Sequence, residues 1–327
     1  MVSSANTATL RASTSPLQPV ARFAWLTLAY NIFVILWGAY VRATGSGAGC
    51  GNRWPLCSGD GLSKTPQAQT VIEFMHRATS GLALVMVMVL LFWCWRRTSK
   101  GDWPRYTALC AVILMFNEAL LGALLVVFEH VGQDRSAGRA AFLCLHFGNT
   151  LLLLASLTLT AQWLSSTDRR FTMTRKPLEW TSVGLGLVSV MAIGITGSLA
   201  ALGDTVFPAT SLRASLAQDF SPNGHLLLRW RVLHPISAIV GTVYVLWVVL
   251  ELSRKRDHSP RTLPLLTATL TVQIALGVMN VLLLAPVWVQ IMHLLVADLF
   301  WILLVLASAE LVLEPTFLHR RARLIRA

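Results

Sequence analysis

The chain has 327 residues, of which 55% are hydrophobic and 13% charged, and its mean hydropathy is +0.61. A chain this apolar exceeds what a soluble domain can bury, so a soluble globular protein is excluded. The net charge of +12 does not indicate a nucleic-acid partner, because the basic residues form short clusters between apolar runs. The composition predicts an all-α integral membrane protein surrounded by lipid.

Eight apolar runs of roughly 20 residues, the length that crosses a bilayer, follow one another along the chain. They lie at about 23–43, 72–95, 106–128, 140–163, 180–203, 232–252, 263–285 and 288–312. Residues 1–22 before them are rich in Ser, Thr and Ala, which predicts a disordered tail and no cleavable signal peptide. Only Pro286 and its neighbours separate the last two runs, so we expect a tight turn there.

Basic residues gather on one side of these runs. The N-terminal tail holds two Lys or Arg residues, and the segments 96–105, 168–176, 254–261 and 319–326 hold four each. By the positive-inside rule, both termini, a linker at 166–179 and a basic tail at 314–327 are predicted to be cytoplasmic. The protein is therefore expected to be multi-pass in the inner (plasma) membrane of the cell.

The loop at about 44–71 then lies outside, in an oxidising compartment where disulfides persist. It contains Cys50 and Cys57, whereas the other three cysteines lie in or beside apolar runs. A disulfide between Cys50 and Cys57 would close a short loop and stabilise the fold by roughly 2 kcal/mol. A structural clip and a redox-active pair both fit this spacing, and we favour the clip.

The first four runs and the last four repeat one another. The matched positions are Gly38 with Gly197, His76 with His234, Glu118-Ala-Leu-Leu-Gly122 with Gln273-Ile-Ala-Leu-Gly277, and His146 with His293. Because each unit has an even number of spans, both insert the same way up, and a pseudo-two-fold axis along the membrane normal follows. The sequence thus predicts two duplicated four-helix bundles, at 23–165 and 180–313.

Four histidines lie one to two turns from the outer ends of the second, fourth, sixth and eighth runs. Because these runs cross the membrane in the same direction, the four imidazoles share one layer near the outer face. Helix bundles commonly bind cofactors between facing side chains, and paired neutral imidazoles suit the axial positions of haem iron. Two bis-histidine haem sites are predicted, one from His76 and His146 and the other from His234 and His293.

Other interpretations of the histidines fit less well. Structural zinc needs four converging ligands, but the duplication separates the histidines two and two. A di-iron carboxylate site needs more Glu-x-x-His motifs than the one that Glu73 and His76 form. Core histidines that only hydrogen-bond to their neighbours remain the alternative.

Charged residues near the histidine layer have two interpretations each. Glu73 shares a helix face with His76 as a catalytic acid, or it lies near a helix start because the dipole favours it there. Four arginines bind haem propionates or snorkel toward lipid headgroups; they are Arg42, Arg77, Arg229 and Arg231. Glu118 and Asp298 are costly inside a bilayer, and either relay protons or bond neighbouring helices.

These motifs together resemble the haem A synthase family. The likeness rests on the glycine-rich run 44–57 with its cysteine pair and Trp54-Pro55, on Ile72-Glu73-Phe74-Met75-His76-Arg77, on Glu118-Ala-Leu-Leu-Gly122 and on Leu145-His146-Phe147-Gly148. It covers nearly all eight spans and is strongest from about 38 to 150. Any one of these motifs alone would be unspecific.

The resemblance implies an enzyme that oxidises the C8 methyl group of haem O to a formyl group, giving haem A for terminal oxidases. It implies that His76 and His146 attend the substrate haem, with Glu73 as the acid beside it. His234 and His293 would ligate a haem B cofactor, and Cys50 and Cys57 would form a disulfide. An enzyme that makes haem O is a candidate partner; the resemblance names neither the electron donor nor an oligomeric state.

The second half departs from the family pattern. Some relatives carry another cysteine pair in the loop corresponding to 204–231, and this chain has none there. Pro235 follows His234, which suits a span that starts near Val232, because proline is tolerated in a first helical turn. Two competing functions remain: a two-haem cytochrome that passes electrons, for example from quinol, and a transporter built from parallel repeats.

Overall fold

A computed structural model describes residues 17–57, 67–166, 170–173, 176–254 and 262–315. Most of the predicted tails at 1–22 and 314–327, residues 167–169 and 174–175 of the linker at 166–179, and most of the basic cluster at 254–261 lie outside the described residues.

All eight predicted spans are helices. They are α1 (Gln18–Ala43), α2 (Ala68–Arg97), α3 (Trp103–Val127), α4 (Ala137–Ser165), α5 (Pro177–Val206), α7 (Leu226–Arg231) continued by α8 (Leu233–Arg254), α9 (Leu263–Leu282) and α10 (Val287–Val312). Eight helical segments of the described chain are long and apolar enough to cross a membrane. The protein is therefore an all-helical, multi-pass membrane protein.

Local sequence explains several helix ends. Proline occupies the first turn of α1, α3, α5 and α9, where its missing N–H costs no hydrogen bond. Pro235 lies in the first turn of α8, as the sequence predicts. The tight turn between α9 and α10 places Leu284 and Ala285 at positive φ, and Pro286 then precedes α10.

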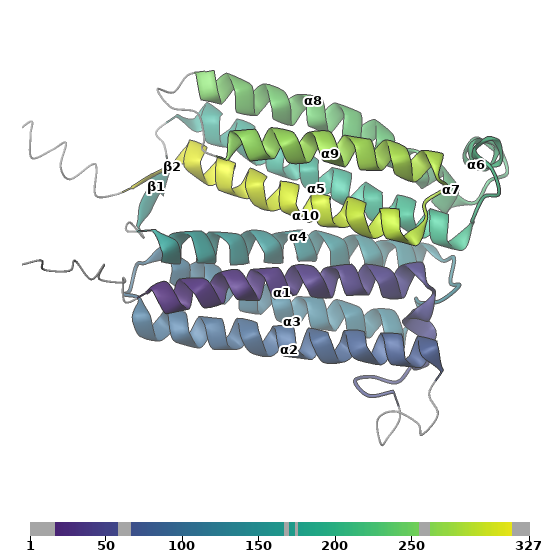
Figure 1. Cartoon of the computed structure of the whole chain (residues 1–327), viewed down its shortest axis with the longest axis horizontal. Coiled ribbons are helices and arrows are strands. Elements are labelled where there is room, and N and C mark those ends of the chain that lie inside the picture. The colour runs from purple at the N-terminus through teal and green to yellow at the C-terminus, as the bar shows by residue number, and fades with distance from the viewer. Residues whose placement is uncertain (1–16, 58–66, 167–169, 174–175, 255–261, 316–327) are drawn as a thin grey trace, which may run out of the picture.

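The helices lie side by side in two groups (Figure 1). In the first group α1 packs on α2 and α4, and α3 packs on α2 and α4. In the second, α8 packs mainly on α5, and α9 on α10. Contacts of α4 with α5 and α10, and of α1 with α10, join the groups. The buried core runs through this junction, where the Trp301 indole N–H donates to the Leu151 carbonyl at 2.7 Å.

The outer faces of α8 and α9 expose large apolar side chains, including Ile239, Val243, Trp247 and Val278. In water such a surface would be costly, so these faces are suited to lipid. The two ends of the molecule differ. A two-stranded antiparallel sheet of β1 (Phe171–Met173) and β2 (Leu313–Pro315) lies at one end, whereas α6 (Leu212–Asp219) and α7 lie at the other (Figure 1).

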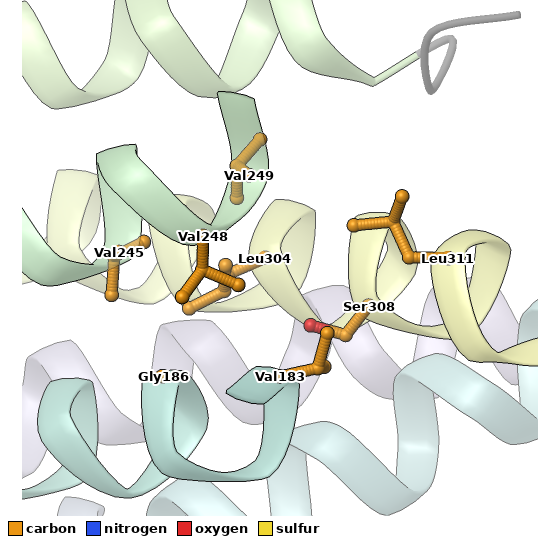
Figure 2. Close-up of a pocket in the computed structure, with 8 residues that line it drawn as sticks. All are labelled: Val183, Gly186, Val245, Val248, Val249, Leu304, Ser308 and Leu311. Carbon is orange, nitrogen blue, oxygen red and sulfur yellow. The ribbon is translucent and has the colours of Figure 1, made fainter. Parts of the chain in front are cut away.

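A small apolar pocket lies between α5, α8 and α10 (Figure 2). Its lining is Val183, Gly186, Val245, Val248, Val249, Leu304, Ser308 and Leu311. It begins three helical turns along α8 from His234, about 16 Å at the rise of an α-helix. With one hydroxyl group and no titratable side chain, this pocket offers no chemistry of its own.

Candidate functional site

Each of the four predicted ligand histidines packs against a glycine of the neighbouring helix. In the first pair, a Cβ atom added to Gly38 would lie 2.9 Å from His76, and one added to Gly122 would lie 3.5 Å from His146. In the second pair, the corresponding distances are 3.0 Å from Gly197 to His234 and 3.3 Å from Gly277 to His293. A side chain at Gly38 would require the His76 ring to shift, and one at Gly197 would require the His234 ring to give by a few tenths of an ångström. Glycine therefore lets two helices approach closely around an imidazole at four separate places.

In the first histidine pair, His146 is held by a carboxylate. Its Nδ1 lies 2.7 Å from Oε1 of Glu118 on α3. Two further side chains of α4, Thr150 and Asn149, donate hydrogen bonds to the same carboxylate. His76, on α2, has a buried Nδ1 with no hydrogen-bond partner.

In the second pair, the rings of His234 and His293 lie with their centroids 6.3 Å apart. Two imidazoles on opposite sides of one metal ion, each with a metal–nitrogen bond of about 2 Å, have their centroids at a similar separation. His234 Nδ1 lies 3.1 Å from the Ile193 carbonyl, which leaves Nε2 available. His293 Nε2 lies 3.3 Å from the Gln273 amide nitrogen, and its buried Nδ1 has no partner.

These donors fit haem iron better than an ion held by protein alone. No group of three or more His, Cys, Asp or Glu side chains that could hold a metal is found in the described part of the chain. Two facing histidines supply only the axial positions, and a porphyrin brings the other four ligands itself. The unsatisfied ring nitrogens of His76 and His293 are polar atoms that need a partner inside the bundle.

Glu73 is buried beneath the cysteine loop. The carboxylate is 3% exposed, accepts the backbone N–H of Cys50 at 2.8 Å and pairs with Arg77. Arg77 also donates to the carbonyls of Arg53, at 2.6 Å, and Pro55, at 3.2 Å. Glu73 and Arg77 thus fasten the loop to α2.

The loop carries the disulfide between Cys50 and Cys57, which confirms that predicted pairing. Thr70 at the start of α2 donates to the Gly49 carbonyl at 2.7 Å and adds another tie. The disulfide loop, residues 44–57, therefore covers the end of α2 that bears Glu73 and His76.

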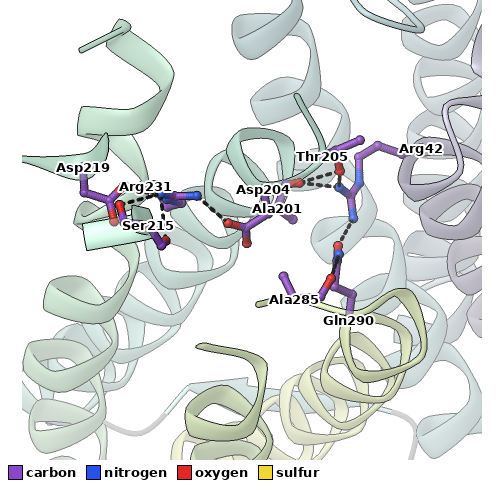
Figure 3. Close-up of polar contacts among 9 residues, drawn as sticks. All are labelled: Arg42, Ala201, Asp204, Thr205, Ser215, Asp219, Arg231, Ala285 and Gln290. Atoms are coloured by element: carbon purple, nitrogen blue, oxygen red, sulfur yellow. Dashed lines mark hydrogen bonds and ion pairs between the residues drawn. The ribbon is translucent and has the colours of Figure 1, made fainter. Parts of the chain in front are cut away.

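Arg42 joins the two helix groups, which the sequence did not indicate (Figure 3). From α1, its guanidinium donates to the Ala201 carbonyl at 2.6 Å and to Thr205 Oγ1 at 2.9 Å on α5. It also donates to Gln290 Oε1 on α10 at 3.0 Å. Its donors thus already have protein acceptors.

The two arginines of α7 also have protein partners. Arg231 pairs with Asp204 at 2.9 Å and with Asp219 at 2.6 Å, so two carboxylates neutralise it (Figure 3). Arg229 donates to the Pro222 carbonyl. Among the four arginines named as propionate partners, Arg231 has the least positive charge left for an additional carboxylate.

The structure also places three further titratable residues, His130, Asp134 and Asp298. His130 is half-buried and pairs with Asp134 at 2.8 Å, so it is not the solvated loop residue that its position suggests. Asp134 has its pKa lowered: burial favours the neutral acid, but hydrogen bonds from Ser136 and His130 outweigh it. Asp298, on α10, is completely buried, and neither of its carboxyl oxygens has a hydrogen-bond partner.

Comparison with known proteins now identifies the family. The profile of the family described as "Cytochrome oxidase assembly protein" matches residues 21–305. The chain belongs to the haem A synthase family. A haem A synthase of Listeria monocytogenes is 29% identical over 85% of this chain and 91% of its own length. One of Alkalihalophilus pseudofirmus is 39% identical over 44% of this chain and 46% of its own.

Another relative has a different name. A protein of Thermus thermophilus named protohaem IX farnesyltransferase is 42% identical over 301 residues, which make up 89% of this chain and 48% of the relative. This chain thus spans about half the length of that relative. The relatives that are named haem A synthases connect this family with haem A biosynthesis.

Proposed function

We propose that this protein is a haem A synthase, which oxidises the C8 methyl group of haem O to a formyl group. The single observation that carries the proposal is the repeated placement of four half-buried histidines, each against a glycine of the neighbouring helix, in a chain of this family. The repeated arrangement supports two duplicated bundles, at 23–165 and 180–313, related by a pseudo-two-fold axis along the membrane normal. Such an axis exchanges α1 with α5 and α4 with α10. It therefore requires a contact of α5 with α4 to match the contact of α1 with α10, and both pairs of helices are in contact.

In this proposal the N-terminal bundle holds the substrate haem between His76 and His146. The C-terminal bundle holds haem B between His234 and His293. A bound haem would supply the iron chemistry that oxidation of an unactivated methyl group requires, with dioxygen or another external oxidant taking up the electrons removed. The protein orients the porphyrin, excludes water and handles protons.

Glu73 is the residue that we propose to move protons at the substrate. It lies one helical turn from His76, and two partners, the Cys50 N–H and Arg77, hold its carboxylate. A fixed carboxylate beside the reacting carbon can accept the proton that methyl oxidation releases and return it to water. The disulfide loop keeps this carboxylate buried, so we propose a structural role for Cys50 and Cys57.

All four arginines stay candidates for the haem propionates, with Arg77 and Arg229 first. Arg42 already donates to three protein oxygens, and Arg231 already pairs with two carboxylates. The basic clusters support cytoplasmic termini and a location in the plasma membrane. The Thermus relative named protohaem IX farnesyltransferase supports a haem-farnesylating enzyme as the partner that delivers haem O. Haem O itself is the proposed substrate.

Haem extraction from purified protein tests the proposal. Haem O or haem A beside haem B is the expected result, together with haem A formation in cells that make haem O and lack their own synthase. Haem B alone and no haem A would instead support an electron-carrying cytochrome. Protein free of haem would support a transporter and would refute both haem proposals.

A further inference from the structure

The two histidine pairs occupy equivalent positions in the repeat but have different polar surroundings. Around His146 four polar side chains gather from α3 and α4: Asn117, Glu118, Asn149 and Thr150. The offsets that match Glu118 to Gln273 and His146 to His293 place Val272, Gln273, Val296 and Ala297 at the corresponding positions. The N-terminal pair thus has a carboxylate and three supporting groups where the C-terminal pair has one amide.

The four polar groups form a complete hydrogen-bond network. Glu118 accepts from Asn149, from Thr150 and, through Oε1, from Nδ1 of His146 at 2.7 Å. Asn117 donates to Asn149 Oδ1 at 2.8 Å, and Asn149 also donates to the Leu114 carbonyl at 2.9 Å. Three donors on two oxygens favour the ionised carboxylate, and the network fixes its direction.

A carboxylate on the second ring nitrogen is the usual means by which a protein orients a ligand histidine and raises its basicity. With Nδ1–H donated to Glu118, His146 can offer only Nε2 to iron. Gln273 reaches His293 through the amide nitrogen at Nε2 and leaves Nδ1 without a partner. An amide carries no charge, so it cannot raise the basicity of His293 in the same way.

We propose that Glu118 is a positioning residue that makes His146 the stronger donor, so that the N-terminal haem has the lower reduction potential. A more basic axial ligand stabilises ferric over ferrous iron, since the higher positive charge gains more from it. The inference rests on the proposed haem sites. It adds that the reduction potentials of the two haem sites differ because Glu118 contacts His146, whereas Gln273 occupies the matched position beside His293.

The test is a reciprocal exchange in full-length purified protein loaded with haem O in addition to its resident haem. Spectroelectrochemical titration at one pH gives both midpoint potentials, and His146→Ala, which removes the N-terminal ligand, assigns them to their sites. At the wild-type midpoint of the N-terminal haem, Glu118→Gln should raise the ferrous-to-ferric ratio about tenfold, equivalent to about 59 mV for one electron. Gln273→Glu should shift the C-terminal haem the opposite way.

Thermal melts of both variants show whether the bundles still fold, and the opposite signs separate an electronic effect from general loosening. If both haems bind and the Glu118→Gln titration overlays that of the wild type, the proposal for Glu118 is wrong while the haem sites stand. Shifts of the same sign in both variants also overturn it. If the wild-type protein binds no haem, the proposed function itself fails.

Discussion

The N-terminal and C-terminal histidine pairs are alike where the backbone sets the geometry and unlike where side chains set the chemistry. In both, a glycine on the adjacent helix makes room for each imidazole. Only the N-terminal pair has buried Glu73, the disulfide loop above it and a carboxylate on His146. In the proposed function, a duplicated scaffold keeps two cofactor positions, of which one specialises for substrate chemistry and the other for a resident haem.

Removal of Glu73 should have the largest effect, and only on the N-terminal side. Glu73→Ala should lower haem A formation by at least about 100-fold, the scale of general acid–base catalysis, while bound haem stays near the wild-type amount. Haem extraction and chromatography measure both quantities. Glu179→Ala, a carboxylate near the opposite end of the molecule, serves as the control. Unchanged haem A formation would remove Glu73 from the mechanism.

Loss of one histidine should separate the two sites. His234→Ala should abolish the low-spin absorption of the C-terminal haem and leave the N-terminal haem bound, because the pairs do not share ligands. Optical spectra and haem stoichiometry report this. His225→Ala is the matched control, since His225 is exposed, caps α7 and packs on Phe207, away from both histidine pairs. Loss of both haems from His234→Ala would show that the sites are not independent.

A smaller effect should follow from filling a glycine gap. Gly197→Ala places a Cβ 3.0 Å from His234, whereas Gly184→Ala on the same helix meets nothing within 4 Å. The first should alter the spectrum and lower the occupancy of the C-terminal haem. The second should leave the haem unchanged and stabilise α5 by up to about 1 kcal/mol, the difference in helix propensity. Equal behaviour of the two variants would contradict the role given to the glycines.

The smallest effect is expected at the junction of the two halves. Arg42→Ala removes hydrogen bonds to α5 and α10, which should cost about 2 kcal/mol of stability, the usual range for bonds to a charged group. A lower melting temperature with both haem spectra intact is the expected result, with Arg213→Ala as control because Arg213 is exposed on α6. Loss of one haem instead would favour Arg42 as a propionate partner.

Much of the fold could be predicted because it depends on local features. The length of an apolar run identifies a span, and the eight runs became the eight helices. Proline at helix starts and two cysteines in one loop were equally readable. The short α6 and the β1–β2 pair were not predicted, since an eight-residue helix carries little periodicity and a strand pair depends on residues far apart in the chain.

The candidate site, like the fold, combines features that the sequence predicts with contacts that only the tertiary structure decides. The residue types, their repeat and their common depth belong to the sequence, because helix rise converts position into depth. The contacts made by Glu118 and Arg42 were decided only by tertiary structure, since side-chain pairing between helices depends on which helix faces meet. Arg42 and Gln290 are 248 residues apart, and no local pattern marks them as partners. The sequence determined where the histidines lie along their helices; helix packing decided which carboxylate holds one of them.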